Sequence, residues 1–126
     1  MDETAPLSDP ILSVIDQFNQ RFNAHDVDGV MALMTDDCIF ENTSPFPDGQ
    51  RYQGQAAVRA FWEEFFAGSP HAHFAGEEQF AAGDRAVVRW RYTWRNADGT
   101  EGHIRGVDVF KVRDGKVAEK LAYVKG

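Results

Sequence analysis

A carboxylate stands among apolar residues in one segment of the chain that alternates like a β-strand. In the run 104–110, a period of two places Asp108 on the same face as Ile104 and Phe110. A buried carboxylate needs a partner, because without one its pKa rises until it stays protonated near neutral pH and can donate a hydrogen bond. Asp108 is therefore our first candidate catalytic residue. The alternatives are that it pairs with an arginine or a backbone donor, or that the opposite face of this strand points inward.

A second candidate is an amide at the end of an early strand-like segment. The run 38–43 alternates with period two, so that if Phe40 points into the core, Asn42 does as well. An amide can orient a carbonyl or hydroxyl group of a ligand, but it is a poor proton acceptor. We therefore pair Asn42 with Asp108 as the candidate catalytic residues and assign ligand orientation to Asn42. The alternative is a turn residue, since Asn is common before a loop such as 44–50, which could lie over a pocket mouth.

Aromatic residues are abundant, and in one segment they occupy a single face. Ten Phe, three Trp and three Tyr make up 13% of the chain. In the run 85–95, Trp90, Tyr92 and Trp94 alternate with three arginines, so one face is aromatic and the other cationic. The aromatic face either fills the core or lines an apolar cavity, and composition alone favours the core. We expect arginines such as Arg89 to pair with surface carboxylates or to meet a second subunit, rather than to bind an anionic substrate.

The elements that position these residues follow from periodicity and turn signals. Apolar spacings of three and four predict a helix that starts at Ser8, Asp9 and Pro10, a short helix capped by Asp26, and a third helix over 55–67. Alternation between glycine-containing turns predicts strands over 38–43, 71–81, 85–95, 102–113 and 116–124. Helices on one side of an antiparallel sheet define an α+β fold, and a strongly curved sheet forms a cone that the helices close.

Length and charge limit the classes of function. With 126 residues the chain fits one domain over 1–126, and we expect residues 1–7 to form a flexible tail. The net charge of −7 argues against nucleic acid and against an anionic membrane surface as partners. Cys38 is the single cysteine, and the N-terminus resembles no signal peptide, so we expect a cytoplasmic protein.

No sequence motif for a metal or a cofactor is present. His71 and His73 form an H-x-H pair, but two ligands do not make a site and no third is clearly placed beside them. The chain also lacks a glycine-rich phosphate loop and a dinucleotide-binding fingerprint. We therefore expect chemistry without metal or cofactor.

Three segments of the chain are similar to a known family. The segments 23–42, 54–62 and 106–117 resemble the second helix with the first strand, the third helix and the last hairpin of the ketosteroid isomerase and SnoaL-like branch of the nuclear transport factor 2-like superfamily. The resemblance implies a cystatin-like α+β barrel, in which a curved antiparallel sheet and three helices enclose an apolar pocket. It also implies a homodimer formed through the outer face of the sheet. It favours the interpretation that the aromatic face lines a cavity over the interpretation that it fills the core.

The resemblance covers the isomerase site only in part. In the isomerases an Asp moves the proton, while a Tyr and a protonated Asp stabilise the dienolate. Asp108 matches the protonated Asp, whereas Asn42 replaces the base and Phe18 replaces the Tyr. Without that base, steroid isomerisation by this route is expected to be lost or very slow.

A second resemblance is to the limonene epoxide hydrolase branch, where a Tyr, an Asn and an Asp position the attacking water and an Arg links two acidic residues. Asn42 would hold the water there and Arg89 falls at the arginine, while Phe40 replaces the Tyr. Arg91 and Ala122 occupy the places of the two aspartates, so the acid and the base of that mechanism are missing.

These observations lead to one expected function and two alternatives. We expect a pocket for a small apolar carbonyl, enol or phenol compound, with isomerase, cyclase or lyase chemistry in which Asp108 donates a proton to developing oxyanion charge. The alternatives are a ligand-binding or dimerisation module without catalysis, and an epoxide hydrolase-like enzyme. The residues expected to contact the ligand are Phe18, Phe22, Phe40, Phe61, Trp90, Tyr92, Ala122 and Val124.

Overall fold

Three helices and six strands make up the described part of the chain. A computed structural model describes residues 9–125, so the predicted tail over 1–7 and the predicted helix start at Ser8 lie outside the described residues. The helices are α2 (Pro10–Asn23), α3 (Val27–Ala32) and α4 (Gln55–Gly68). The strands are β1 (Met34–Glu41), β2 (Arg51–Gln53), β3 (His73–Ala82), β4 (Arg85–Arg95), β5 (Glu101–Arg113) and β6 (Lys116–Val124). The predicted order of helices, early strand and meander is confirmed.

Three details of β1 and β2 differ from the prediction. β1 begins at Met34, four residues before the predicted start, because Met34 pairs with Val117 of β6 and the intervening residues continue the strand. β1 also ends at Glu41, which leaves Asn42 just beyond it. The three-residue β2 was not predicted, since Arg51–Gln53 has no alternating pattern and is held in the sheet by pairing with β1.

The helix starts follow from side chains that cap the free backbone N–H groups. Asp9 Oδ1 accepts hydrogen bonds from the backbone N–H groups of Ile11 and Leu12, at 2.9 and 3.3 Å, and Pro10 follows as the first helical residue. Asp26 Oδ1 accepts from the backbone N–H of Gly29 at 2.9 Å, as the predicted cap of α3. No helix within residues 9–125 is long and apolar enough to cross a membrane.

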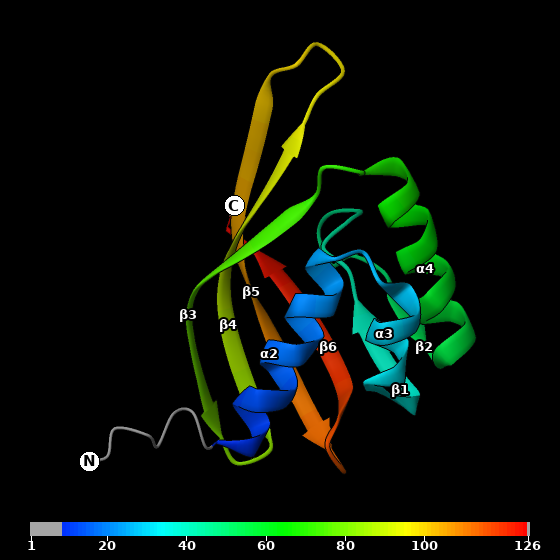
Figure 1. Ribbon diagram of the computed structural model, residues 1–126, viewed down its shortest axis with the longest axis vertical. Helices are drawn as coiled ribbons and strands as arrows, with labels where there is room; N and C mark the ends of the chain where they lie inside the picture. The colour runs from blue at the N-terminus through cyan, green and yellow to red at the C-terminus, as the bar shows by residue number, and fades with distance from the viewer. Residues whose placement is uncertain (1–8, 126) are drawn as a thin grey trace.

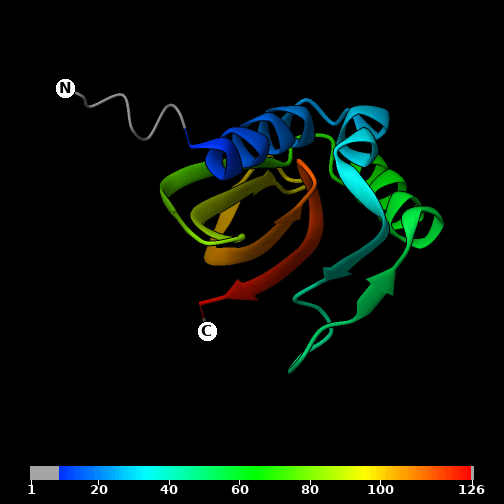
Figure 2. The same ribbon diagram turned by 90° about the horizontal axis from the view of Figure 1, so that it is seen from below.

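The six strands form one curved sheet in the order β2-β1-β6-β5-β4-β3. Neighbouring strands are antiparallel except β1 and β6, which run parallel, so the sheet is mixed rather than wholly antiparallel. Figure 1 shows α2 crossing the face of the sheet, with α3 and α4 beside β1 and β2. Figure 2 shows that the sheet curls and that the helices close its open side, as predicted for a cone.

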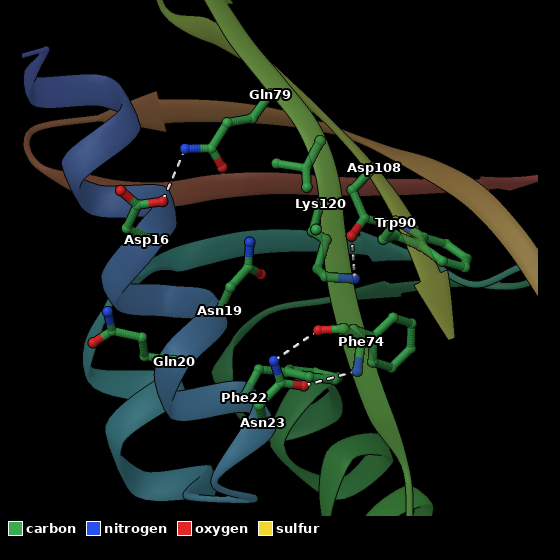
Figure 3. Close-up of a pocket in the computed structure, with 12 residues that line it drawn as sticks. Asp16, Asn19, Gln20, Phe22, Asn23, Phe74, Gln79, Trp90, Asp108 and Lys120 are labelled. Carbon is green, nitrogen blue, oxygen red and sulfur yellow. Dashed lines mark hydrogen bonds and ion pairs between the residues drawn. The ribbon is translucent and has the colours of Figure 1, made fainter. Parts of the chain in front are cut away.

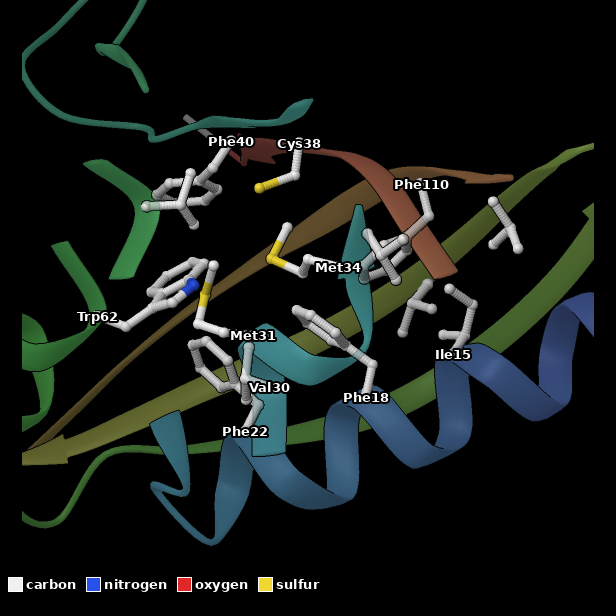
Figure 4. Close-up of a cluster of buried hydrophobic side chains, with 14 of the residues drawn as sticks. Ile15, Phe18, Phe22, Val30, Met31, Met34, Cys38, Phe40, Trp62 and Phe110 are labelled. Carbon is white, nitrogen blue, oxygen red and sulfur yellow. The ribbon is translucent and has the colours of Figure 1, made fainter. Parts of the chain in front are cut away.

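The space between helices and sheet is filled by a cluster of apolar side chains (Figure 4). Ile15 and Phe18 of α2 are fully buried, and the Phe18 ring contacts the Phe110 ring of β5 edge-on, with centroids 5.7 Å apart. Trp62 of α4 lies 4.9 Å from the ring of Phe22, centroid to centroid. These contacts join the apolar stripes of both long helices to the inward face of the sheet.

One glycine is required by close packing on the inward face. Gly106 of β5 pairs with Trp90 of β4 across the sheet. A Cβ at position 106 would lie 2.7 Å from the Trp90 ring and would clash with the backbone oxygen of Tyr123. The absence of a side chain here lets the Trp90 ring lie against the backbone of β5.

We therefore predict that Gly106→Ala lowers the free energy of unfolding by about 1–3 kcal/mol, because a backbone oxygen cannot move aside as a side chain can. The matched control is Gly68→Ala at the end of α4, where an added Cβ meets nothing within 4 Å. That variant is expected to be as stable as the native chain or more stable by up to about 1 kcal/mol, because alanine favours helix. Urea denaturation measures both, and equal stabilities of the two variants would contradict the prediction.

Candidate functional site

An apolar cavity of about 320 Å³ lies between α4, the inward face of the sheet and the residues that follow β1. Exposed Ser44 stands at its rim, and aromatic rings form most of its wall. Of the predicted ligand-contacting residues, those that line it are Phe22, Phe40, Phe61, Trp90, Tyr92, Ala122 and Val124. The aromatic residues that the sequence places on inward faces therefore contribute both to the core and to the cavity wall.

Phe18 is the predicted ligand-contacting residue that does not line this cavity. It is fully buried one helical turn before Phe22, and its ring packs on Phe22 and Phe110. It is a core residue, because α2 crosses the sheet and brings only its C-terminal end to the cavity wall (Figures 1 and 4).

Asp108 and Lys120 form a buried ion pair at the cavity wall. Lys120 Nζ lies 3.2 Å from Asp108 Oδ2, and about 5% of each side chain is exposed. Both residues line the cavity (Figure 3 shows the pair from another side). The partner of Asp108 is thus a lysine, and neither of the predicted alternatives, an arginine or a backbone donor, is found.

The ammonium group of Lys120 is also surrounded by aromatic rings. Its Nζ lies between 5.2 and 6.0 Å from four ring centroids. A ring face attracts a cation, and this attraction is strongest where water is excluded. The four rings belong to Phe22, Phe40, Trp62 and Phe110.

Burial and charge act in opposite directions on the carboxyl group. Burial raises the pKa of Asp108 above its ordinary value, and the positive charge of Lys120 opposes that rise. Asp108 Oδ1 and the indole N–H of Trp90 have no hydrogen-bond partner among the described residues. One carboxylate oxygen therefore holds Lys120, while the other makes no hydrogen bond of ordinary geometry, although the Trp90 indole also helps to lower the pKa of this carboxyl.

Lys120 was not among the predicted site residues, although the sequence contains a signal for it. Alternation from Ala122 and Val124, both predicted to contact ligand, places Lys120 on the same face. Alternation from the apolar Val117 places it on the opposite face. The structure reconciles the two, because a bulge near Lys111 lets both Val117 and Ala118 point inward and shifts the register of the rest of β6.

Asn42 lies directly after β1, in a turn at the edge of the cavity. Its Oδ1 accepts a hydrogen bond from the backbone N–H of Thr43 at 2.7 Å, and its own backbone N–H donates to the carbonyl oxygen of Gln50 at 3.0 Å. It also lines the cavity. Asn42 is thus a turn residue at the cavity rim, with one of its hydrogen-bonding groups already used by the turn.

The arginines and histidines lie away from the cavity. Arg89 is exposed on the outer face of the sheet, where its guanidinium lies 3.6 Å from Glu78 and 4.0 Å from Glu77. Arg91 is exposed as well, so the arginine and acid arrangement suggested by the epoxide hydrolase resemblance is not assembled at the cavity. Within residues 9–125, no three His, Cys, Asp or Glu side chains come together in a group that could hold a metal ion.

Comparison with known proteins gives similarity over nearly the whole chain. The SnoaL-like domain family matches residues 15–120. A nuclear transport factor 2-like protein of unknown function from Mesorhizobium loti is 38% identical, with 100% of this chain and 97% of that chain covered and a TM-score of 0.77. A search of curated proteins finds no significant match.

Two more distant structures share the fold. TerC, crystallised with polyporic acid, is 22% identical over 93% of this chain and 92% of its own, with a TM-score of 0.79. A candidate polyketide cyclase from Sinorhizobium meliloti is 20% identical over 88% of this chain and 94% of its own, with a TM-score of 0.72.

The ion pair gives a prediction about stability. Lys120→Met leaves the Asp108 carboxylate buried without a partner, so we expect the free energy of unfolding at pH 7 to fall by about 3–5 kcal/mol. The double variant Lys120→Met with Asp108→Leu should recover most of this loss, because no buried charge remains. Urea denaturation of the native chain, both single variants and the double variant measures the coupling.

The pH dependence has a definite sign. In Lys120→Met, burial raises the pKa of Asp108 without the opposing charge of Lys120, so the folded state binds this proton more tightly than the unfolded state. The loss in the free energy of unfolding caused by Lys120→Met should therefore shrink as the pH is lowered and grow as the pH rises through the pKa of Asp108 in the folded variant. The control Arg85→Met breaks the half-exposed pair with Glu119 and should cost about 0–1 kcal/mol. A Lys120→Met deficit no larger than this control would contradict the prediction.

Proposed function

The chain belongs to the SnoaL-like domain family and has the nuclear transport factor 2-like fold, and we propose that it binds a small, largely apolar carbonyl, enol or phenol compound in the cavity beside Lys120. The observation that carries this proposal is the buried Asp108–Lys120 pair in a wall that is otherwise mostly aromatic. Rings contact the apolar body of such a ligand, while the ammonium donates a hydrogen bond to its oxygen. The structures of candidate polyketide cyclases and of TerC with polyporic acid support a ligand of this class.

The same geometry suits acid-base chemistry without a cofactor. A fixed ammonium group in a site with little water stabilises negative charge that develops on a carbonyl oxygen. The free oxygen of Asp108 can accept a proton from the carbon next to that carbonyl, and burial raises the pKa of this carboxyl, which makes it a stronger base. We therefore propose isomerase, cyclase or lyase chemistry in which Lys120 is the oxyanion donor, Asp108 moves the proton and Asn42 contacts the ligand at the rim.

A binding protein without catalysis is the second candidate. It is favoured by the absence of any carboxylate other than Asp108 among the described residues that line the cavity, and by the engagement of that carboxylate with Lys120. Exchange of enolisable protons separates the two candidates. An enzyme of the proposed type should incorporate deuterium from heavy water into a bound aromatic ketone, whereas a binding protein should not.

Ligand binding itself gives a prediction. We expect 4-nitrophenol to bind with its ionised, yellow form favoured, because the Lys120 ammonium stabilises the phenolate and so lowers the ligand's pKa. Lys120→Met should weaken phenolate binding by about 10–100-fold, as expected for the loss of a charge-assisted hydrogen bond. Quenching of tryptophan fluorescence and the visible absorbance of the phenolate provide independent measurements, since Trp62 and Trp90 line the cavity.

The matched control is Lys116→Met on the same strand, where the lysine is exposed. It should leave both the affinity and the ionised fraction unchanged. Equal affinity of Lys120→Met and the native chain would rule out Lys120 as the oxygen-binding group, and no binding by the native chain would rule out the ligand class.

We also propose that two copies of the chain associate through the outer face of the sheet. Phe80 and Tyr123 on this face are 53% and 54% exposed, and Arg105 pairs there with Glu77 at 3.3 Å, so the surface offers apolar contact and both signs of charge. A surface of this kind can be complementary to itself across a two-fold axis.

If two copies associate, the molecular mass in solution should be that of two chains. Light scattering after size-exclusion chromatography measures this mass. Tyr123→Glu should shift the protein to the monomer, because the added carboxylate would be buried at the contact. Ala57→Glu on the exposed side of α4 should not change the mass. A native chain that remains monomeric at high concentration would overturn the proposal.

A further inference from the structure

A second cavity also reaches the Asp108–Lys120 pair. This cavity of about 210 Å³ lies between α2 and the strands β3 and β4, and its wall also contains Asp108 and Lys120 (Figure 3). Its outer part is polar, and Asp16 accepts a hydrogen bond there from Gln79 Nε2 at 2.9 Å. The pair thus lines both an apolar cavity suited to an organic ligand and a second cavity whose outer residues are polar and can hold water.

We propose that Lys120 acts as an amine nucleophile and forms a protonated imine with the aldehyde or ketone group of a compound bound in the apolar cavity, with Asp108 as the proton carrier. This inference rests on the proposed binding of carbonyl compounds and adds a covalent step to it. Three features of the described residues support the step.

The first feature is that the pair contains every proton that the step needs. The Lys120 ammonium transfers one proton to the Asp108 carboxylate, which leaves a neutral amine 3.2 Å from a carboxylic acid. The amine nitrogen attacks the carbonyl carbon, the C=O π-bond breaks, and proton transfer from nitrogen to oxygen gives a carbinolamine. Asp108 then protonates the hydroxyl group, which leaves as water while the C=N bond forms. The products are an iminium ion, a carboxylate and one water molecule.

The second feature is that the positive charge on the Lys120 nitrogen keeps its stabilising contacts when the imine forms. The ammonium and the iminium ion carry the same single positive charge on the same nitrogen. The four aromatic rings around Nζ and the Asp108 carboxylate therefore stabilise the product as they stabilise the free lysine. Burial raises the pKa of Asp108, which makes its carboxylate a better acceptor for the proton of the lysine.

The third feature is the second cavity, whose outer residues are polar. The released water can leave toward Asp16, Asn19 and Gln79 without crossing the bound ligand, and water for the reverse hydrolysis can enter by the same side. The unpartnered atoms Asp108 Oδ1 and Trp90 Nε1 offer an acceptor and a donor to such a water. Ligand and water thus approach the nitrogen from different directions.

Reductive trapping tests the proposal. The native protein is incubated with 2-naphthaldehyde and sodium cyanoborohydride at pH 7, and the labelled lysines are found by peptide mass spectrometry. The chain has only four lysines, of which Lys116 and Lys125 are exposed and Lys111 is half-buried. We expect one label per chain at Lys120, formed at least about tenfold faster than at Lys116, as for an amine that reacts with a bound carbonyl.

Two controls separate this inference from the proposed binding function. Lys120→Arg removes the nucleophilic amine and should lose the fast label, whereas Lys116→Arg should keep it. If Lys120→Arg does not fold, saturating 4-nitrophenol should slow labelling of Lys120 in the native protein and leave Lys116 unaffected.

The outcomes are distinct. A native protein that binds 4-nitrophenol but shows Lys120 labelled no faster than the exposed lysines overturns the imine and leaves the binding function intact. A native protein that neither binds 4-nitrophenol nor labels at Lys120 overturns both.

Discussion

Lys120 brings its ammonium group into the interior of the cone, where Asp108 and four ring faces replace the water that the charge has lost. Removing either charge from water is costly, so the pair is tolerated only with close geometry and favourable surroundings. This requirement explains why the rings of Phe22, Phe40 and Trp62 converge on one point from α2, β1 and α4. Two of the four rings come from the helices that close the cone, and the other two come from the sheet.

The pair depends in turn on the register of the β5–β6 hairpin. Asp108 lies opposite Ala122, and Lys120 lies opposite Phe110, so the two charges are diagonal neighbours on the inward face. The register starts at a two-residue turn in which Asp114 and Gly115 both have positive φ, at 56° and 75°. The bulge near Lys111 then changes which side of β6 points inward. A turn and a bulge whose residues do not line the cavity therefore decide that a lysine faces it.

The aromatic residues serve two purposes that differ only in position. In the middle of α2, Ile15 and Phe18 are fully buried, and Phe18 packs on Phe110 of β5 in a solid core. Toward the C-terminal end of α2, the sheet curves away from the helices, and Phe22, Phe61 and Tyr92 border open space instead. Curvature of the sheet thus converts one continuous apolar face into a core at one end and a cavity at the other. This is the division that supports a ligand-binding function for so small a chain.

The sequence by itself determined the helices with their caps, the hairpin strands and the inward face of Trp90 and Asp108, because these depend on local capping, turn chemistry and alternation. It also placed a carboxylate where burial would force it to find a partner. Only the tertiary structure decided that the partner is Lys120, that β1 pairs in parallel with β6, and that Phe18 belongs to the core rather than to the cavity. Those three outcomes arise from pairing between segments distant in the chain, from a bulge that shifts alternation, and from the curvature of the sheet. Long-range pairing and sheet curvature leave no local pattern of residues, and at Lys120 alternation from Val124 and alternation from Val117 give opposite faces, so spacing along the chain could not predict these outcomes.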